Sequence, residues 1–109
     1  MYRNYKSAVI IPCYKVLSNL KKTVETIPNF VDLIIIIDDA CPNNSVAVEL
    51  STITKKDRVI YQRNSANQGV GGAFFVGFEI AREKQVELVA KIDGDGQHER
   101  DNLSHYFNK

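Results

Sequence analysis

Two carboxylates near the end of the chain have a spacing that suits a metal ion. Asp93 and Asp95 follow the largely apolar stretch 86–90, and residues two apart on an extended chain face the same side. Two converging carboxylates repel each other unless a cation lies between them, and hard divalent ions such as Mg²⁺ and Mn²⁺ prefer oxygen ligands. Gly94 and Gly96 allow a sharp turn and close approach of a ligand. The alternative is an acidic surface turn, because Asp-Gly is also a common turn signal.

Three more polar segments follow apolar runs in the same way. They are Tyr14-Lys15, Asp38-Asp39 and Asn67-Gln68-Gly69. If each apolar run is a strand of one parallel sheet, all four segments lie at its carboxyl edge, where such sheets bind ligands. We therefore expect the functional site at that edge.

The elements that must position these segments alternate along the chain. Four short apolar runs read as strands, at 7–12, 30–37, 58–62 and 87–92, and the 30–37 run is the most apolar. Between them, apolar residues recur at helical spacing, and a last helix is expected from Glu99. The pattern predicts an α/β fold: a Rossmann-like open parallel sheet with helices on both faces, its second strand central and its fourth beside the first.

The polar stretch 63–72 is expected to be a loop, followed by a helix whose inner face is formed by the residues at 73, 74, 77, 78 and 81. Its glycines do not match the dinucleotide fingerprint, because Phe74 takes the last glycine position and the stretch follows the third strand. We expect Gly71 and Gly72 to serve close helix packing. A helix N-terminus that approaches a pyrophosphate stays open.

Composition limits the function classes. The 109 residues are 44% hydrophobic and 25% charged with a net charge of +1, which fits a single domain, 1–109, and gives no basic stripe for nucleic acid. No apolar stretch is long enough for a membrane span, and the N-terminus lacks the apolar core of a signal peptide. Cys13 and Cys41 are too few for a disulfide framework, so we expect small buried thiols in a cytoplasmic protein.

The pair Asp38-Asp39 has two readings. One carboxylate could cap the helix that follows, since acidic residues are favourable at helix N-termini, although Asn43, Asn44 and Ser45 are better placed for that. The other reading is functional, because an acidic residue after the second strand is where doubly wound folds hold a ribose. We favour contacts to a ribose or nucleobase.

Taken together, these motifs resemble the inverting family 2 glycosyltransferases of the GT-A fold. Within that family they are most similar to the dolichyl- and polyprenyl-phosphate mannose or glucose synthases. The matching segments, in the family's order over nearly the whole chain, are 9–14, 37–45, 67–73 and 92–98. Ala40-Cys41-Pro42 departs from the Gly-Ser that the family usually shows.

The resemblance implies roles for the site residues. Asp38 and Asp39 would contact the base and ribose of a UDP- or GDP-linked sugar, in a pocket shaped by Pro12 and Tyr14. The donor-binding set further includes the residues Asn67, Gly69 and Asp93. Asp93 would also lie against the metal, with Asp95 and Gln97 as ligands of an Mn²⁺ or Mg²⁺ that bridges the diphosphate.

Family members continue well past this length, and their catalytic base and acceptor-binding half belong to that later part. The chain is thus expected to be an N-terminal, donor-binding portion that is inactive alone, from an enzyme that transfers a sugar to a polyprenyl phosphate or glycan at the cytoplasmic membrane face. The alternative is a nucleotide-binding module without transferase activity. A phosphatase that uses Asp-x-Asp fits poorly, because that motif should follow the first strand.

Overall fold

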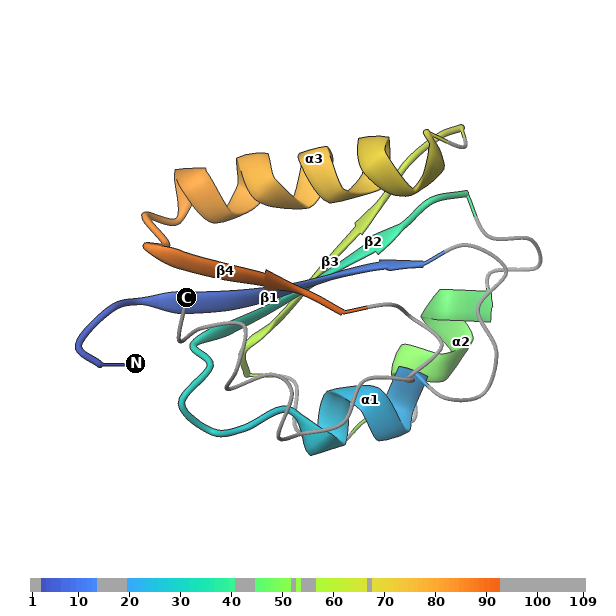
Figure 1. Ribbon diagram of the computed structural model, residues 1–109. Coiled ribbons are helices and arrows are strands. Elements are labelled where there is room, and N and C mark those ends of the chain that lie inside the picture. Colours follow the sequence, from blue (N-terminus) through green and yellow to red (C-terminus); the bar gives the residue numbers. More distant parts are fainter. Residues whose placement is uncertain are drawn as a thin grey trace.

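The computed structural model describes residues 3–13, 20–40, 45–51, 53, 57–66 and 68–92. Strands and helices alternate through these residues (Figure 1). Their bounds are β1 Ser7–Cys13, α1 Leu20–Thr26, β2 Leu33–Asp38, α2 Ser45–Ser51, β3 Val59–Arg63, α3 Gly69–Glu83 and β4 Leu88–Lys91. The expected last helix from Glu99 lies outside the described residues.

The four strands form one parallel sheet in the order β3-β2-β1-β4. This confirms the predicted fold class, the internal position of the second strand and the pairing of the fourth strand with the first. Both faces of β1 and β2 are covered, and Ile10, Ile11 and the run Ile34–Ile37 are fully buried. Burial on both faces explains why these strands read as continuous apolar runs without polar alternation.

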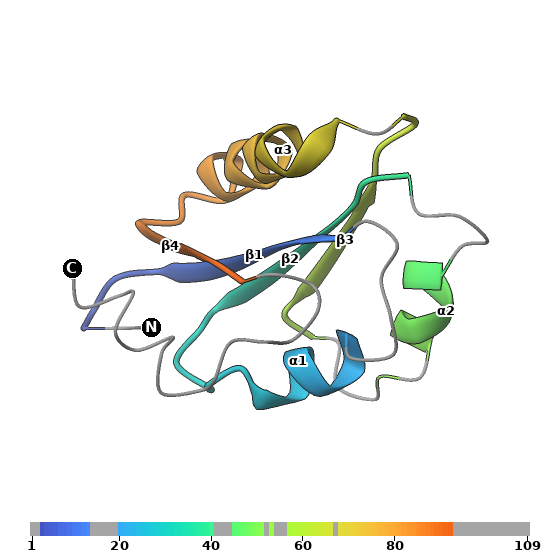
Figure 2. The same ribbon diagram turned by 45° about the vertical axis from the view of Figure 1, so that its right-hand side comes forward.

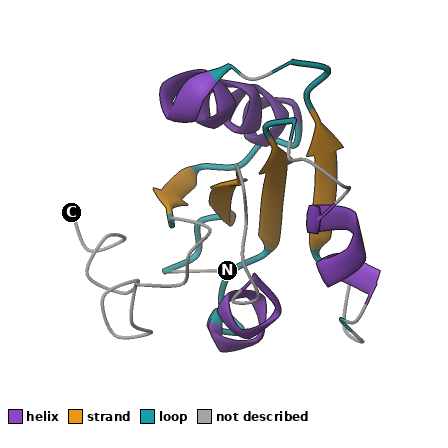
Figure 3. Ribbon diagram, turned by 90° about the vertical axis from the view of Figure 1, so that its right-hand side faces the viewer, coloured by secondary structure: helices purple, strands orange, loops and turns teal. Residues whose placement is uncertain are grey.

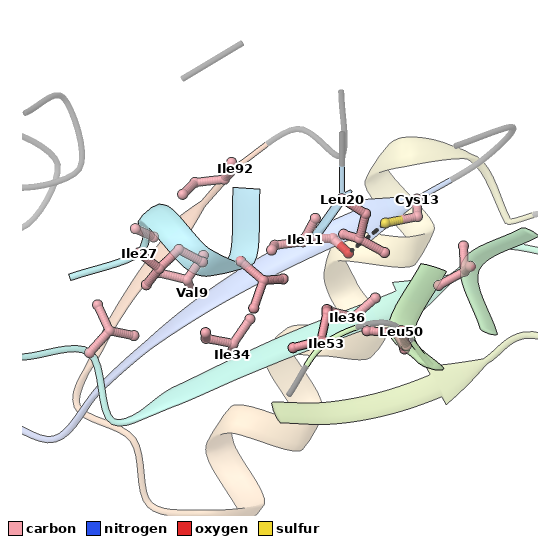
Figure 4. Packing of buried hydrophobic residues seen from close by; sticks show 14 residues of the cluster. Val9, Ile11, Cys13, Leu20, Ile27, Ile34, Ile36, Leu50, Ile53 and Ile92 are labelled. Atoms are coloured by element: carbon pink, nitrogen blue, oxygen red, sulfur yellow. Dashed lines mark hydrogen bonds between the residues drawn. The ribbon is translucent and has the colours of Figure 1, made fainter. Parts of the chain in front are cut away.

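Helices cover the two faces of the sheet unequally. Among the described helices, α3 packs on one face, and α1 and α2 lie on the other, as Figures 1 and 2 show. On the α1/α2 face, Val9, Ile11, Ile34 and Ile36 pack with apolar residues of both helices, and Cys13 belongs to this core as the small filler that we expected (Figure 4). The Cys13 thiol donates a hydrogen bond to the Ile11 carbonyl at 3.5 Å.

The second strand begins later than its apolar run. Leu33 is its first residue, whereas the run was predicted to be extended from residue 30. Asp32 lies just before this start and bonds to the first residue of β1: its carboxylate accepts a hydrogen bond from the backbone N–H of Ser7 at 2.8 Å, and its own N–H donates to the Ser7 carbonyl at 3.0 Å. Asp32 thus aligns the starts of β1 and β2.

α3 begins inside the stretch that was expected to be a loop. Its first turn contains Gly69, Gly71 and Gly72. The packing role predicted for Gly71 is wrong, because Gly71 is exposed and no described neighbour lies within 4 Å of where its Cβ would be. A Cβ at Gly72 would meet, among the described neighbours, only the Gln68 side chain within that range, at 2.8 Å. Gly77 instead makes the close helix–sheet contact, with its missing Cβ 2.5 Å from Ile10.

The inner face of α3 is mostly as predicted. Ala73, Gly77 and Ala81 are buried against the sheet and Phe74 is partly buried, but Phe78 is 42% exposed. None of the helices among the described residues is long and apolar enough to cross a membrane.

Candidate functional site

All four strands are parallel, so their carboxyl ends lie at one edge of the sheet, toward the right-hand side of Figure 1; Figure 3 views the molecule from that side. From β1 the chain proceeds outward to β2 and β3, then returns to β4 on the other side of β1. The strand order therefore reverses between β1 and β4, and ligands of open parallel sheets bind at such a reversal. Of the predicted site residues, the structure describes Pro12, Asp38, Asp39 and Gly69, whereas Tyr14, Asn67, Asp93, Asp95 and Gln97 lie outside the described residues.

Asp38 is the last residue of β2 and is fully buried. It pairs with Cys13 of β1 and Arg63 of β3 in the sheet register. Its Oδ2 accepts a hydrogen bond from the Tyr61 hydroxyl at 2.5 Å and another from the Arg63 guanidinium at 2.8 Å. Two charge-assisted hydrogen bonds from one neighbouring strand keep this carboxylate in place without exposing it.

Asp39 is 2% exposed and holds the start of α3. Its Oδ1 accepts hydrogen bonds from the Asn64 side chain at 2.9 Å and from the Gln68 backbone N–H at 2.7 Å. Its Oδ2 accepts the Gly69 backbone N–H at 2.9 Å. An anion already lies at this helix N-terminus, so the first turn of α3 is neutralised by protein. Helix capping, the alternative reading of Asp38-Asp39, therefore applies to Asp39, but the helix that the structure shows it to cap is α3.

The two carboxylates therefore point to opposite sides of the sheet. Ile34 and Ile36 face α1 and α2, while Ile35 and Ile37 face α3. By this alternation Asp38 lies on the α1/α2 side, where Tyr61 and Arg63 reach it. Asp39 lies on the α3 side. In this arrangement protein groups bond both carboxylates, and their direct contact with a ligand stays a prediction.

Pro12 and Gly69 flank the same edge. Pro12 is the penultimate residue of β1, partly exposed and paired with Ile37, as expected for a residue that supplies no backbone donor. Gly69 has a φ of +78°, which side-chain-bearing residues rarely adopt. That backbone conformation lets consecutive N–H groups of Gln68 and Gly69 reach the Asp39 carboxylate.

Three residues of the edge were not singled out from the sequence. Tyr61 and Arg63 come from β3, and Asn64 follows directly. All three donate to the carboxylates of Asp38 or Asp39. The sequence feature that could have indicated them is Arg63, a positive charge at the end of the third strand that can pair with the negative charge of Asp38 at the end of the second strand.

The metal-binding prediction rests on residues outside those described. Within the described part of the chain, no group of three or more His, Cys, Asp and Glu residues could hold a metal ion. The chain stays bonded to β1 up to the residue before Asp93: Lys91 pairs with Ile10, and the Ile92 N–H donates to the Ile10 carbonyl at 3.0 Å. The predicted metal ligands follow directly in the sequence. Carboxylate and amide oxygens are of the ligand type that suits Mg²⁺ or Mn²⁺, and metal binding by Asp93, Asp95 and Gln97 stays a prediction.

Comparison with known proteins identifies the family. Residues 8–109 match the model of glycosyl transferase family 2, a span that begins at the second residue of β1 and includes the other three strands and the Asp-Gly-Asp segment. The chain belongs to glycosyl transferase family 2.

Relatives with curated names are similar to this family 2 chain at low identity. A UDP-N-acetylglucosamine–dolichyl-phosphate N-acetylglucosaminyltransferase of Methanococcus voltae is 31% identical, over 88% of this chain and 43% of the relative. A polyprenol monophosphomannose synthase of Mycolicibacterium smegmatis is 28% identical, over 91% and 38%. An undecaprenyl-phosphate mannosyltransferase of Micrococcus luteus is 25% identical, over 86% and 40%. The family 2 chain thus spans about two fifths of the length of these relatives.

Proposed function

We propose that this chain binds the nucleotide-sugar donor of a metal-dependent, inverting glycosyltransferase whose acceptor is a lipid phosphate. The observation that carries the proposal is the adjacency of β1 and β4. It makes a strand-order reversal whose carboxyl edge leads directly to Asp93 and Asp95. Family membership supports sugar transfer, and the names of the three relatives supply the class of acceptor.

In this proposal the carboxylates of Asp93 and Asp95 and the amide oxygen of Gln97 would hold Mg²⁺ or Mn²⁺. The bound ion would offset the negative charge that develops on the departing nucleoside diphosphate. An oxygen of the acceptor phosphate attacks the anomeric carbon from the opposite side, so the bond to the diphosphate breaks with inversion. The whole protein would carry this out in the cytoplasm, at the membrane face where a lipid phosphate is accessible.

Metal-dependent nucleotide binding tests the proposal. With UDP or GDP at about ten times its dissociation constant, mass action stabilises the fold by roughly 1.4 kcal/mol. For a domain of this size we expect a rise of about 6 to 11 °C in melting temperature with Mn²⁺, and little rise with EDTA. Asp95→Asn should remove most of the metal-dependent rise.

Asp57→Asn is the matched control, because Asp57 is an exposed carboxylate remote from the segment after β4 in sequence. It should keep the full rise in melting temperature. Equal rises with EDTA and with Mn²⁺, or an undiminished rise in Asp95→Asn, would show that the Asp-Gly-Asp segment is not the metal site.

A further inference from the structure

Arg63, Tyr61 and Asp38 form a bonded cluster at the carboxyl ends of β2 and β3. The guanidinium and the phenol both donate to the same Asp38 oxygen, at 2.8 Å and 2.5 Å. The Asp38 side chain is fully buried, whereas the Arg63 side chain is 40% exposed and Tyr61 is 38% exposed. A ligand at this edge therefore meets Arg63 and Tyr61, with the carboxylate beneath them.

The cluster offers hydrogen-bond donors rather than net charge. The hydrogen bond to Asp38 raises the pKa of the Arg63 guanidinium above its ordinary value, so Arg63 stays charged. Burial, and then the hydrogen bond to Asp38, raise the pKa of Tyr61 to about 12, so its phenol stays protonated. Because the Asp38 carboxylate balances Arg63, the cluster suits a neutral group with acceptor atoms better than a diphosphate.

The position in the sheet agrees with this. Neighbouring strands lie about 4.8 Å apart, so the ends of β3 and β4, three strand spacings apart in the order β3-β2-β1-β4, are separated by roughly 14 Å. If the diphosphate of the donor lies beside the segment after β4, the nucleoside extends across β1 toward β2 and β3. In that orientation the nucleobase would be the part of the donor that reaches Arg63.

We propose that Arg63 contacts the nucleobase of the donor, and that Asp38 and Tyr61 are positioning residues that fix its guanidinium. This inference rests on the proposed donor-binding function. A planar guanidinium can donate to the carbonyl oxygens of uracil, or to O6 and N7 of guanine as a bidentate pair. Asp38 thereby acts on the base through Arg63 and not by direct contact.

A comparison of the dissociation constants for a nucleotide and for pyrophosphate separates the contribution of the nucleoside from that of the phosphates. We would titrate the ¹⁵N-labelled chain with UDP, GDP and inorganic pyrophosphate in Mg²⁺, and obtain dissociation constants from amide shifts, which also report folding. Arg63→Gln should weaken binding of the preferred nucleoside diphosphate at least about tenfold and leave pyrophosphate binding within about twofold. Tyr61→Phe, which loses only the hydroxyl contact to Asp38, should weaken nucleotide binding about threefold.

Two further variants keep the test decisive. Arg82→Gln removes the same charge at the other end of α3, where Arg82 is 74% exposed beside Glu79, and should change neither dissociation constant. Arg63→Lys keeps the charge but loses the planar donor fork, so it should also weaken nucleotide binding. It takes the place of Arg63→Gln if that variant does not fold.

The experiment distinguishes a failure of the Arg63 contact from a failure of donor binding itself. If wild-type protein binds nucleotide and both Arg63 variants bind it equally well, the inference is wrong and the donor site stands. A matching loss of pyrophosphate affinity in the Arg63 variants would also overturn it, because Arg63 would then contact phosphate. If wild-type protein binds neither nucleotide with Mg²⁺, the donor site and this inference fail together.

Discussion

Asp39 stabilises the first turn of α3 from outside the helix. The N-cap residue, Gln68, makes no side-chain capping hydrogen bond to the described helix, so its backbone N–H and that of Gly69 depend on the Asp39 carboxylate. A carboxylate also interacts favourably with the positive end of the helix dipole. One side chain at the end of β2 therefore fixes where α3 begins.

Replacement of Asp39 by alanine should lower the free energy of unfolding by about 1 to 3 kcal/mol. The buried Asn64 amide loses its acceptor, whereas water can replace the carboxylate at the exposed residues Gln68 and Gly69. Urea unfolding measures the change. Asp57→Ala, at an exposed position, should stay within about 0.5 kcal/mol of wild type, and an equally small change in Asp39→Ala would contradict this role.

Tyr61 should make stability depend on pH in the alkaline range. Burial, followed by the hydrogen bond to Asp38, raises its pKa from 10.0 to about 12 in the folded protein. Because the folded-state pKa is the higher one, the protonated phenol contributes its full stability below about pH 10 and loses it as the pH rises through about 12. The urea midpoint should therefore fall further between pH 9 and pH 11 in wild type than in Tyr61→Phe. Parallel declines would refute the coupling.

At the scale of elements, α3 approaches the sheet closely because its inner face carries small residues. Ala73, Gly77 and Ala81 are buried there, and an added Cβ at Gly77 would lie 2.5 Å from Ile10 Cγ2 and 3.3 Å from Ile37 Cγ1. Gly71 lies in the same helix without such neighbours among the described residues. The two positions thus offer the same substitution with and without a steric conflict.

Gly77→Ala should destabilise the protein by about 1 to 3 kcal/mol, because overpacking at the buried contact exceeds the gain in helix propensity. Gly71→Ala should instead stabilise it by about 0.5 to 1 kcal/mol, since alanine loses less conformational freedom in a helix. Thermal unfolding of both variants measures the difference. If the two substitutions change stability in the same direction, the close contact at Gly77 does not control the packing of α3.

Arg58 connects the opposite layer to the sheet. Just before β3, its guanidinium donates to the carbonyls of Ile27, Pro28 and Val31 at 2.7 to 2.9 Å. These carbonyls lie between the end of α1 and the start of β2. Partial burial lowers the pKa of Arg58 from its ordinary value, and the three carbonyl acceptors offset the loss of water around its charge.

For the whole molecule, the strand order decides where the candidate site lies. β1 and β2 are buried on both faces, and β3, at the sheet edge, carries the exposed residues Tyr61 and Arg63. The reversal between β1 and β4 and the cluster on β3 lie along the same carboxyl edge. A nucleotide that lies across the strand ends would contact both, so the metal and base contacts that we propose require the complete four-stranded sheet.

The sequence by itself determined the fold class and the position of the candidate residues Asp38 and Asp39 at the carboxyl edge of the sheet. Continuous apolar runs such as Ile34–Ile37 are found where both faces of a strand are buried, and polar residues directly after such runs must lie at the carboxyl edge of a parallel sheet. The order of the strands was also predictable, because right-handed crossovers leave few alternatives. The helical start of α3 was not, since the glycines at 69–72 have weak helix propensity.

Only the tertiary structure decided what Asp38 and Asp39 contact. Adjacent residues at a strand end face opposite sides, and the partners of each carboxylate come from residues 23 to 30 positions later in the chain, on or just after β3 and at the start of α3. Which donors reach a buried carboxylate depends on strand register and helix placement, and local sequence patterns do not encode either. For the same reason Arg63 emerged as a candidate ligand contact only when the structure showed its guanidinium bonded to Asp38.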